Sequence, residues 1–225
     1  MTEITAKVDQ SLREEMFTAI KEGDLAAVEK LVTQDHTLVN VMDDQGQSAV
    51  LTAAYNQKPE ITAFLVKKRA RLNLFEACAV GKIEKVKSIL KKKPAAVNDF
   101  APDGFQPIGL ASFFGHVEVV RFLLESGAEV NTPSHNGLKV TPLNSAAAGR
   151  HYEIAMLLLE KGANPNIRQE GEFVPLHSAA MNGQIEMVKL LLQYGADKDA
   201  KSADGKTAHD YALENGHKIV AEVLA

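Results

Sequence analysis

Seven histidines and one cysteine are the side chains of this sequence best suited to metal binding or nucleophilic catalysis. The histidines are His36, His116, His135, His151, His177, His209 and His217. No two of them have the spacing that places two metal ligands on one face of a helix. The sequence also lacks a Gly-x-Ser-x-Gly turn, a phosphate-binding loop and a dinucleotide-binding fingerprint. We therefore predict no catalytic residue, no metal site and no cofactor, and we do not expect an enzyme.

Cys78 lies among small apolar residues, with Ala77 before it and Ala79 and Val80 after it. This surrounding predicts a buried position, where a thiol stays protonated and inert rather than acting as a nucleophile. A single cysteine also excludes an internal disulfide and a cysteine-based zinc site.

Composition sets limits on the class of protein. The 225 residues carry a net charge of −4, with 45% apolar and 24% charged residues, as in an ordinary soluble chain. The mild acidity argues against general nucleic-acid binding, and no apolar run of about 18 residues predicts a membrane span. Residues 1–10 lack the basic start and apolar stretch of a signal peptide, so we expect a cytoplasmic protein.

The elements that would have to position any site repeat along the chain. Residues 115–131, 151–166 and 183–199 share an apolar pattern of helical period, followed by Gly-Ala and a short polar segment. A second signature precedes two of these segments, as Thr-Pro-Leu-Asn-Ser-Ala-Ala at 141–147 and Val-Pro-Leu-His-Ser-Ala-Ala at 174–180.

These signatures resemble the ankyrin-repeat family, whose unit of about 33 residues opens with Thr-Pro-Leu-His-x-Ala. The resemblance implies an all-α solenoid of about seven helix pairs with short β-finger loops. The expected pairs cover roughly 11–34, 48–69, 74–93, 106–125, 141–160, 174–193 and 207–224. We expect a single domain, 1–225, with N-terminal capping helices in 1–40, regular repeats in 41–205 and a C-terminal cap in 206–225.

Repeat positions also give the histidines a structural interpretation. His116, His151 and His217 occupy one repeat position, and His177 and His209 fall near the histidine of the opening motif. We expect all five to make structural hydrogen bonds at helix starts.

Two departures from the repeat pattern carry structural predictions. Asn73 runs directly into Leu74, so about nine residues of a finger are missing there. Gln57 and Arg150 replace a glycine that other copies have after the first helix, which puts the end of those helices in doubt.

In ankyrin repeats, partners usually meet the finger tips and the exposed face of the inner helices, so the resemblance implies a concave binding surface for a protein or peptide. We call the matching positions here the candidate surface. It consists of Phe100, Phe105, Phe113, Phe114, His135, Val140, Phe173, Met181 and Asn182. Exposed aromatic residues are typical of binding hot spots. An alternative is that Phe113 and Phe114 pack on a neighbouring helix or under a finger, because consecutive helical residues cannot both point outward.

Charge is distributed unevenly. The segment from Lys67 to Lys93 has a net charge of +8, and the remainder of the chain has −12. The segment could attract an acidic partner, a nucleic acid or a membrane surface, although lysines at the ends of two outer helices also complement the helix dipole.

We therefore predict a monomeric, non-catalytic protein–protein interaction module with no nucleic-acid partner. Two alternatives remain open: a regulatory subunit or ligand-sensing accessory of an enzyme, and a solenoid that scaffolds its own assembly. The sequence does not identify the partner.

Overall fold

The computed structural model describes residues 9–225, and this part of the chain is all-α apart from turns and one isolated bridge between Met42 and Ser48. The part of the predicted cap that falls on residues 1–8 lies outside the described residues. The chain divides into two compact units, the first ending at Glu76 and the second beginning at Ala77. The prediction that residues 1–225 form a single domain stays a prediction.

Each of the seven predicted helix pairs is present in residues 9–225, so the expected all-α repeat fold is confirmed. The first helices of the pairs are α1 (Gln10–Glu22), α3 (Ala49–Tyr55), α5 (Leu74–Ala79), α7 (Pro107–Phe113), α9 (Pro142–Ala148), α11 (Pro175–Met181) and α13 (Ala208–Glu214). The second helices are α2 (Leu25–Gln34), α4 (Pro59–Lys67), α6 (Ile83–Lys92), α8 (Val117–Glu125), α10 (Tyr152–Glu160), α12 (Ile185–Gln193) and α14 (Lys218–Leu224). Short 3-10 turns are η1 (His36–Asn40), η2 (Pro94–Asn98) and η3 (Glu170–Glu172).

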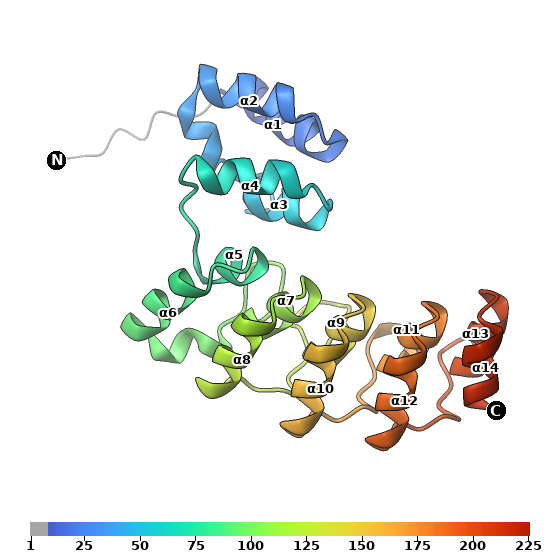
Figure 1. Ribbon diagram of the computed structural model, residues 1–225. Coiled ribbons are helices and arrows are strands. Elements are labelled where there is room, and N and C mark those ends of the chain that lie inside the picture. The colour runs from blue at the N-terminus through green and yellow to red at the C-terminus, as the bar shows by residue number, and fades with distance from the viewer. Residues whose placement is uncertain (1–8) are drawn as a thin grey trace. The chain divides into compact units, whose positions relative to one another are not determined.

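In the first unit, α1 packs on α2 and α3, and α3 packs on α4. In the second unit, α7, α9, α11 and α13 follow one another in an inner row, and α6, α8, α10, α12 and α14 follow one another in an outer row (Figure 1). The space between the two rows is filled by fully buried apolar side chains such as Leu123, Leu143 and Leu158. Burial of a side chain of this size stabilises the fold by about 1.5–3 kcal/mol, so the stack itself supplies the core.

The inner helices begin as their sequence predicts. Thr141 and Asn144 form a reciprocal cap at the start of α9, and proline occupies the first turn, where its missing N–H costs no hydrogen bond. Thr207 and Asp210 repeat this cap on α13.

The departures from the repeat pattern have clear structural outcomes. Only the short segment 68–73 joins α4 to α5, with no finger, as predicted. The doubt about Gln57 and Arg150 is resolved, because α3 and α9 end before them and both residues adopt left-handed backbone conformations, with φ of 53° and 63°.

Within residues 9–225 the fingers are turns rather than extended strands: the first keeps the isolated bridge between Met42 and Ser48, and each of the next two is closed by a backbone hydrogen bond between its ends. The N–H of Ala101 donates to the carbonyl of Phe105 over 2.9 Å, and that of Ser134 donates to the carbonyl of Val140 over 2.9 Å. Each finger is therefore a short, closed loop that leads directly into an inner helix.

Candidate functional site

Backbone hydrogen bonds join successive finger tips in the second unit. The N–H of His135 donates to the carbonyl of Gly104 over 2.8 Å. The N–H of Glu170 donates to the carbonyl of Leu138 over 2.9 Å, and the N–H of Ala203 donates to the carbonyl of Gly171 over 2.8 Å. A loop fixed on both sides in this way loses little conformational entropy when a partner binds, so the tips are preorganised.

The first part of the candidate surface is a packed pair of rings on neighbouring fingers. Phe100 is half-buried and stacks on the exposed His135, with ring centroids 3.5 Å apart and an interplanar angle of 11°. The side-chain amide of Asn136 donates to the carbonyl of Asp103 over 2.7 Å. The stacked rings of Phe100 and His135 therefore help to hold the two neighbouring fingers together, and they also lie near the surface of the fingers.

Phe113 and Phe114 lie at the end of α7 and contact each other edge to face, with centroids 5.1 Å apart. Phe113 is 38% exposed, whereas Phe114 and the finger residue Phe105 are half-buried. The outcome lies between the two sequence interpretations, because one ring of the pair faces solvent and the other is partly covered.

Val140 and Phe173 end the next two fingers, and both are half-buried. The ring of Phe173 lies 5.2 Å from those of His177 and Tyr211, measured between centroids. Since His177 and Tyr211 are buried, Phe173 belongs in large part to the packing beneath the finger.

Met181 and Asn182 lie at the end of α11, and Met181 is 37% exposed. The carbonyl oxygen of the Asn182 side chain accepts a hydrogen bond of 3.2 Å from the guanidinium of Arg150, which follows α9. Arg150 is a polar group of this surface that sequence reasoning did not assign to it. The sequence feature that could have indicated this role is that Arg150 stands where other repeats have glycine.

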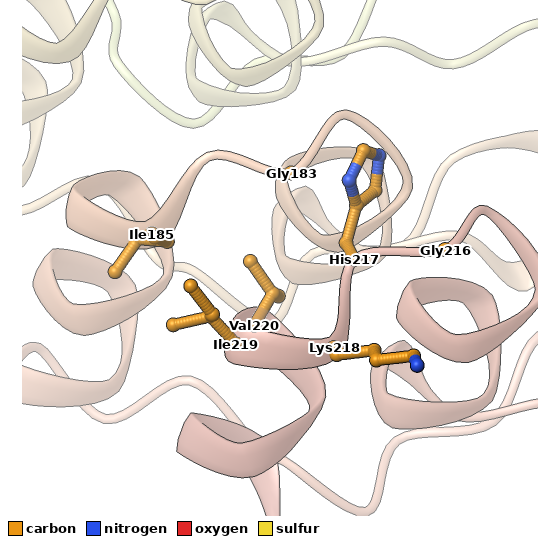
Figure 2. Close-up of a pocket in the computed structure, with 7 residues that line it drawn as sticks. All are labelled: Gly183, Ile185, Gly216, His217, Lys218, Ile219 and Val220. Carbon is orange, nitrogen blue, oxygen red and sulfur yellow. The ribbon is translucent and has the colours of Figure 1, made fainter.

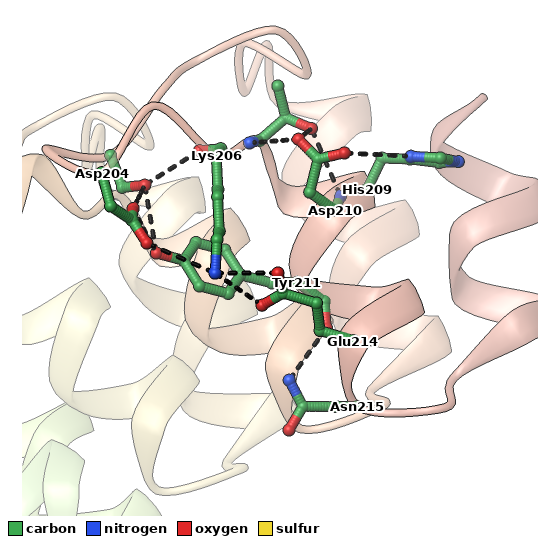
Figure 3. A network of polar contacts seen from close by, with 9 residues as sticks. Asp204, Lys206, His209, Asp210, Tyr211, Glu214 and Asn215 are labelled. Atoms are coloured by element: carbon green, nitrogen blue, oxygen red, sulfur yellow. Dashed lines mark hydrogen bonds and ion pairs between the residues drawn. The ribbon is translucent and has the colours of Figure 1, made fainter.

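The last finger carries a network of charged and hydroxyl groups (Figure 3). The ammonium of Lys206 lies 2.8 Å from a carboxylate oxygen of Glu214 and 3.5 Å from one of Asp204. The hydroxyls of Ser202 and Tyr211 both donate to Asp204. These bonds lower the pKa of Asp204 to about 2, so this carboxylate stays charged at neutral pH. One ammonium group thus lies between two carboxylates, and the network fixes the finger on α13.

Three of the histidines bond as predicted from their shared repeat position. The Nε2 atoms of His116, His151 and His217 lie 2.9, 3.0 and 3.0 Å from the carbonyl oxygens of Ala79, Phe113 and Met181, respectively. Each histidine therefore ties the start of an outer helix to the end of the inner helix in the preceding pair.

His177 is buried in the second unit, where its Nδ1 accepts from the N–H of Val174 and its Nε2 lies 3.0 Å from the carbonyl of Ala200. Burial lowers the pKa of His177, against the opposing effect of the Ala200 bond. His209 lies beside the cap of α13, with its Nδ1 3.8 Å from a carboxylate oxygen of Asp210, and Asp210 itself holds the capping position.

Other chemistry is scarce in the part of the chain that the structure describes. Among residues 9–225, no group of three or more His, Cys, Asp or Glu side chains is placed to hold a metal ion. Cys78 is fully buried as predicted, and burial raises the pKa of its thiol. The longest described helix, α1, has 13 residues, and none of the helices described is both long and apolar enough to cross a bilayer.

A pocket of about 370 Å³ lies between the starts of α12 and α14 (Figure 2). Ile185 and Ile219 lie on its apolar side, and the side chain of Lys218 points away from them. Ile219 is 62% exposed and stands where five other outer helices carry a glutamate. Those glutamates are Glu60, Glu84, Glu118, Glu153 and Glu186. At this position the terminal helix thus exposes an apolar side chain where those five helices have a charged one.

Comparison with known proteins points to one family. Residues 74–169 and 169–225 match the family described as ankyrin repeats (3 copies), which covers more than half of the chain. Alpha-latrocrustotoxin-Lt1a of Latrodectus tredecimguttatus is 30% identical over 123 residues, or 51% of this chain. Human ankyrin repeat and KH domain-containing protein 1 is 37% identical over 94 residues, or 42% of this chain.

A third relative, ankyrin repeat and KH domain-containing protein mask-1 of Caenorhabditis elegans, is 30% identical over 154 residues, or 65% of this chain. The matches span 9%, 4% and 6% of the lengths of these three relatives, in the order given. The chain therefore matches a small part of much longer proteins.

Proposed function

This chain belongs to the ankyrin-repeat family, and from that premise we propose that it is a non-catalytic recognition module that binds a protein or peptide on the candidate surface. Ankyrin repeats indicate a protein–protein interaction module. We also propose that it acts as a cytoplasmic monomer, in line with its composition.

One observation carries the choice of surface. Phe113 and Met181 occupy the same repeat position, the last residue of α7 and of α11, and both are more than one third exposed. The helix between them, α9, has the small, exposed residue Ala148 at that position. This order of large, small and large side chains suits a partner's apolar side chain that lies over Ala148 and contacts both flanking residues.

The backbone hydrogen bonds between successive finger tips support the same proposal. The tips of the fingers that lead into these inner helices are linked by backbone hydrogen bonds, so the finger part of the surface needs little ordering on binding. A few exposed large side chains on a rigid support are the usual source of binding energy in protein interfaces.

Partner capture from a native lysate tests this function. The double variant Phe113→Ser, Met181→Ser should recover at least about tenfold less partner than the unchanged protein. Each lost hot spot weakens the binding free energy by more than about 1 kcal/mol. Tyr152→Ser is the matched control, since Tyr152 is similarly exposed but lies at the start of the outer helix α10. Thermal unfolding of all variants separates loss of binding from loss of fold.

The outcome also distinguishes the alternative functions. Equal recovery of the partner by the double variant and the control would show that the partner does not bind at Phe113 and Met181. A small-molecule thermal shift without a recovered protein would favour the ligand-sensing accessory of an enzyme.

A further inference from the structure

A groove of about 480 Å³ lies between the outer helices α6 and α8, away from the candidate surface. Its lining consists of Lys87, Leu90, Lys91, Pro94, Phe122 and Ser126. All of these residues belong to the second unit, and none of them is part of the finger tips or the inner helices. Binding in this groove would therefore be independent of the function proposed above.

The groove has an apolar part. Leu90 is buried, Phe122 is half-buried and Pro94 begins the 3-10 turn η2, so their carbon atoms supply most of the contact surface. The Ser126 hydroxyl already donates to the carbonyl of Phe122 over 2.8 Å. A volume of this size admits one large apolar side chain together with its neighbouring backbone.

The groove also has a basic wall. Lys87 and Lys91 are one helical turn apart on α6, so both ammonium groups project along the same side of that helix. Lys87 pairs with Glu84 over 3.0 Å, whereas Lys91 pairs with no carboxylate in the described part of the chain. Four lysines and one glutamate lie on α6, and the helix dipole alone does not require a lysine in its middle turns.

Charged residues of α8 near the groove lining limit the choice of ligand. Helix α8 carries Glu118 and Glu125 beside Arg121, and Arg121 lies 3.8 Å from Glu153. A continuous polyanion such as a nucleic acid or an anionic membrane would meet these carboxylates. A short segment can place its acidic groups on the α6 side only.

We propose that this groove binds an acidic protein segment, with a large apolar side chain against Leu90, Pro94 and Phe122 and flanking carboxylates paired with Lys87 and Lys91. Charge complementarity selects the segment, and the apolar floor anchors it. In this proposal Lys87 and Lys91 bind the partner's carboxylates, in addition to any effect that lysines of α6 have on the helix dipole.

The absence of tryptophan from the chain makes a direct test possible. The ligand is a short synthetic peptide with one tryptophan between two runs of glutamate, and its fluorescence is titrated with the whole protein at low salt. The emission should shift to the blue as the indole enters the apolar part of the groove. The same peptide with lysine in place of glutamate should show no shift.

Charge variants locate the binding site. Lys87→Gln with Lys91→Gln should weaken binding by about fivefold or more, because two ion pairs of about 0.5 kcal/mol each are lost. Lys161→Gln with Lys218→Gln removes the same net charge from exposed positions elsewhere in the second unit and should leave the affinity within about twofold. The double variant Phe113→Ser, Met181→Ser should bind the peptide normally.

Three results would overturn the proposal. The first is a peptide affinity that falls equally in both lysine pairs, which indicates only net charge. The second is binding without a blue shift. The third is tighter binding of single-stranded DNA or phosphatidylserine vesicles than of the peptide, with the same dependence on Lys87 and Lys91.

Discussion

At one repeat position a glutamine replaces the glycine of other copies, and its backbone keeps the left-handed conformation that favours glycine. Gln57 has a φ of 53° where the equivalent Gly115 and Gly183 have 82° and 68°. A side chain in this left-handed region costs about 1 kcal/mol relative to glycine. The position therefore keeps its conformation at the expense of stability.

We expect Gln57→Gly to raise the free energy of unfolding by about 0.5–1 kcal/mol, since glycine adopts the same conformation without strain. Urea unfolding followed by circular dichroism measures the change. The control is Gln193→Gly, at a right-handed position that ends α12, where glycine should lower stability. If both substitutions destabilise the protein, strain at Gln57 is not significant.

His177 links residue chemistry to pH. Its pKa in the folded protein lies below the ordinary value, chiefly because it is buried, and its Nδ1 must stay unprotonated to accept from Val174. The unfolded chain therefore binds a proton that the native chain does not as the pH falls below about 6.5. Its contribution to stability is complete above that pH and is lost progressively on acidification.

We expect His177→Asn to lower stability near neutral pH but to reduce its decline between about pH 7.5 and about pH 5.5. Asparagine is the residue at the equivalent capping position of α9, so the fold should tolerate it. His116→Gln should flatten the decline in the same way, because burial also lowers the pKa of His116. Urea titrations at several pH values give the slopes, and slopes identical to that of the unchanged protein would contradict this assignment.

At the scale of elements, asparagine side chains connect successive helix pairs of the second unit. The amide of Asn131 donates to the carbonyl of Gly162 over 3.0 Å, and its oxygen accepts from the N–H of Asn164 over 2.8 Å. Asn98 and Asn166 make the same two contacts with the pairs that follow them. The ends of the outer helices are thus joined by a ladder of side chains, parallel in function to the ladder of finger tips.

Asn131→Ala should cost about 1–2 kcal/mol of stability, because two hydrogen bonds between neighbouring pairs are lost. Asn215→Ala is the control, since the amide of Asn215 donates only within its own helix pair, to the carbonyl of Tyr211. Hydrogen exchange should show faster opening of α8 and α10 in the Asn131 variant alone. Uniform exchange in both variants would mean that the asparagine ladder carries no coupling.

For the whole molecule, the open question is whether the two compact units unfold together. A continuous repeat stack couples each pair to its neighbours, so we predict a single domain over residues 1–225 with one cooperative transition. Hydrogen exchange in increasing urea, followed separately for α1–α4 and for α7–α12, measures this directly. Coincident midpoints support one domain, and two separated midpoints would establish two.

The sequence by itself determined the helix pairs, their boundaries to within a few residues, the missing finger before α5 and the family. These features depend on local periodicity, on capping residues and on glycine or proline at fixed positions, all of which a single repeat displays. The buried, inert thiol of Cys78 followed from its neighbours in the same way.

Only the tertiary structure decided which side chains of the candidate surface face solvent. Phe113 and Phe173 are both aromatic residues at predicted contact positions, yet Phe113 is exposed and Phe173 packs on Tyr211 from the following helix pair. The groove beside Lys91 is likewise formed by two helices from successive pairs. Exposure at these positions depends on contacts between residues far apart in sequence, and local periodicity carries no information about the size or orientation of those neighbouring side chains.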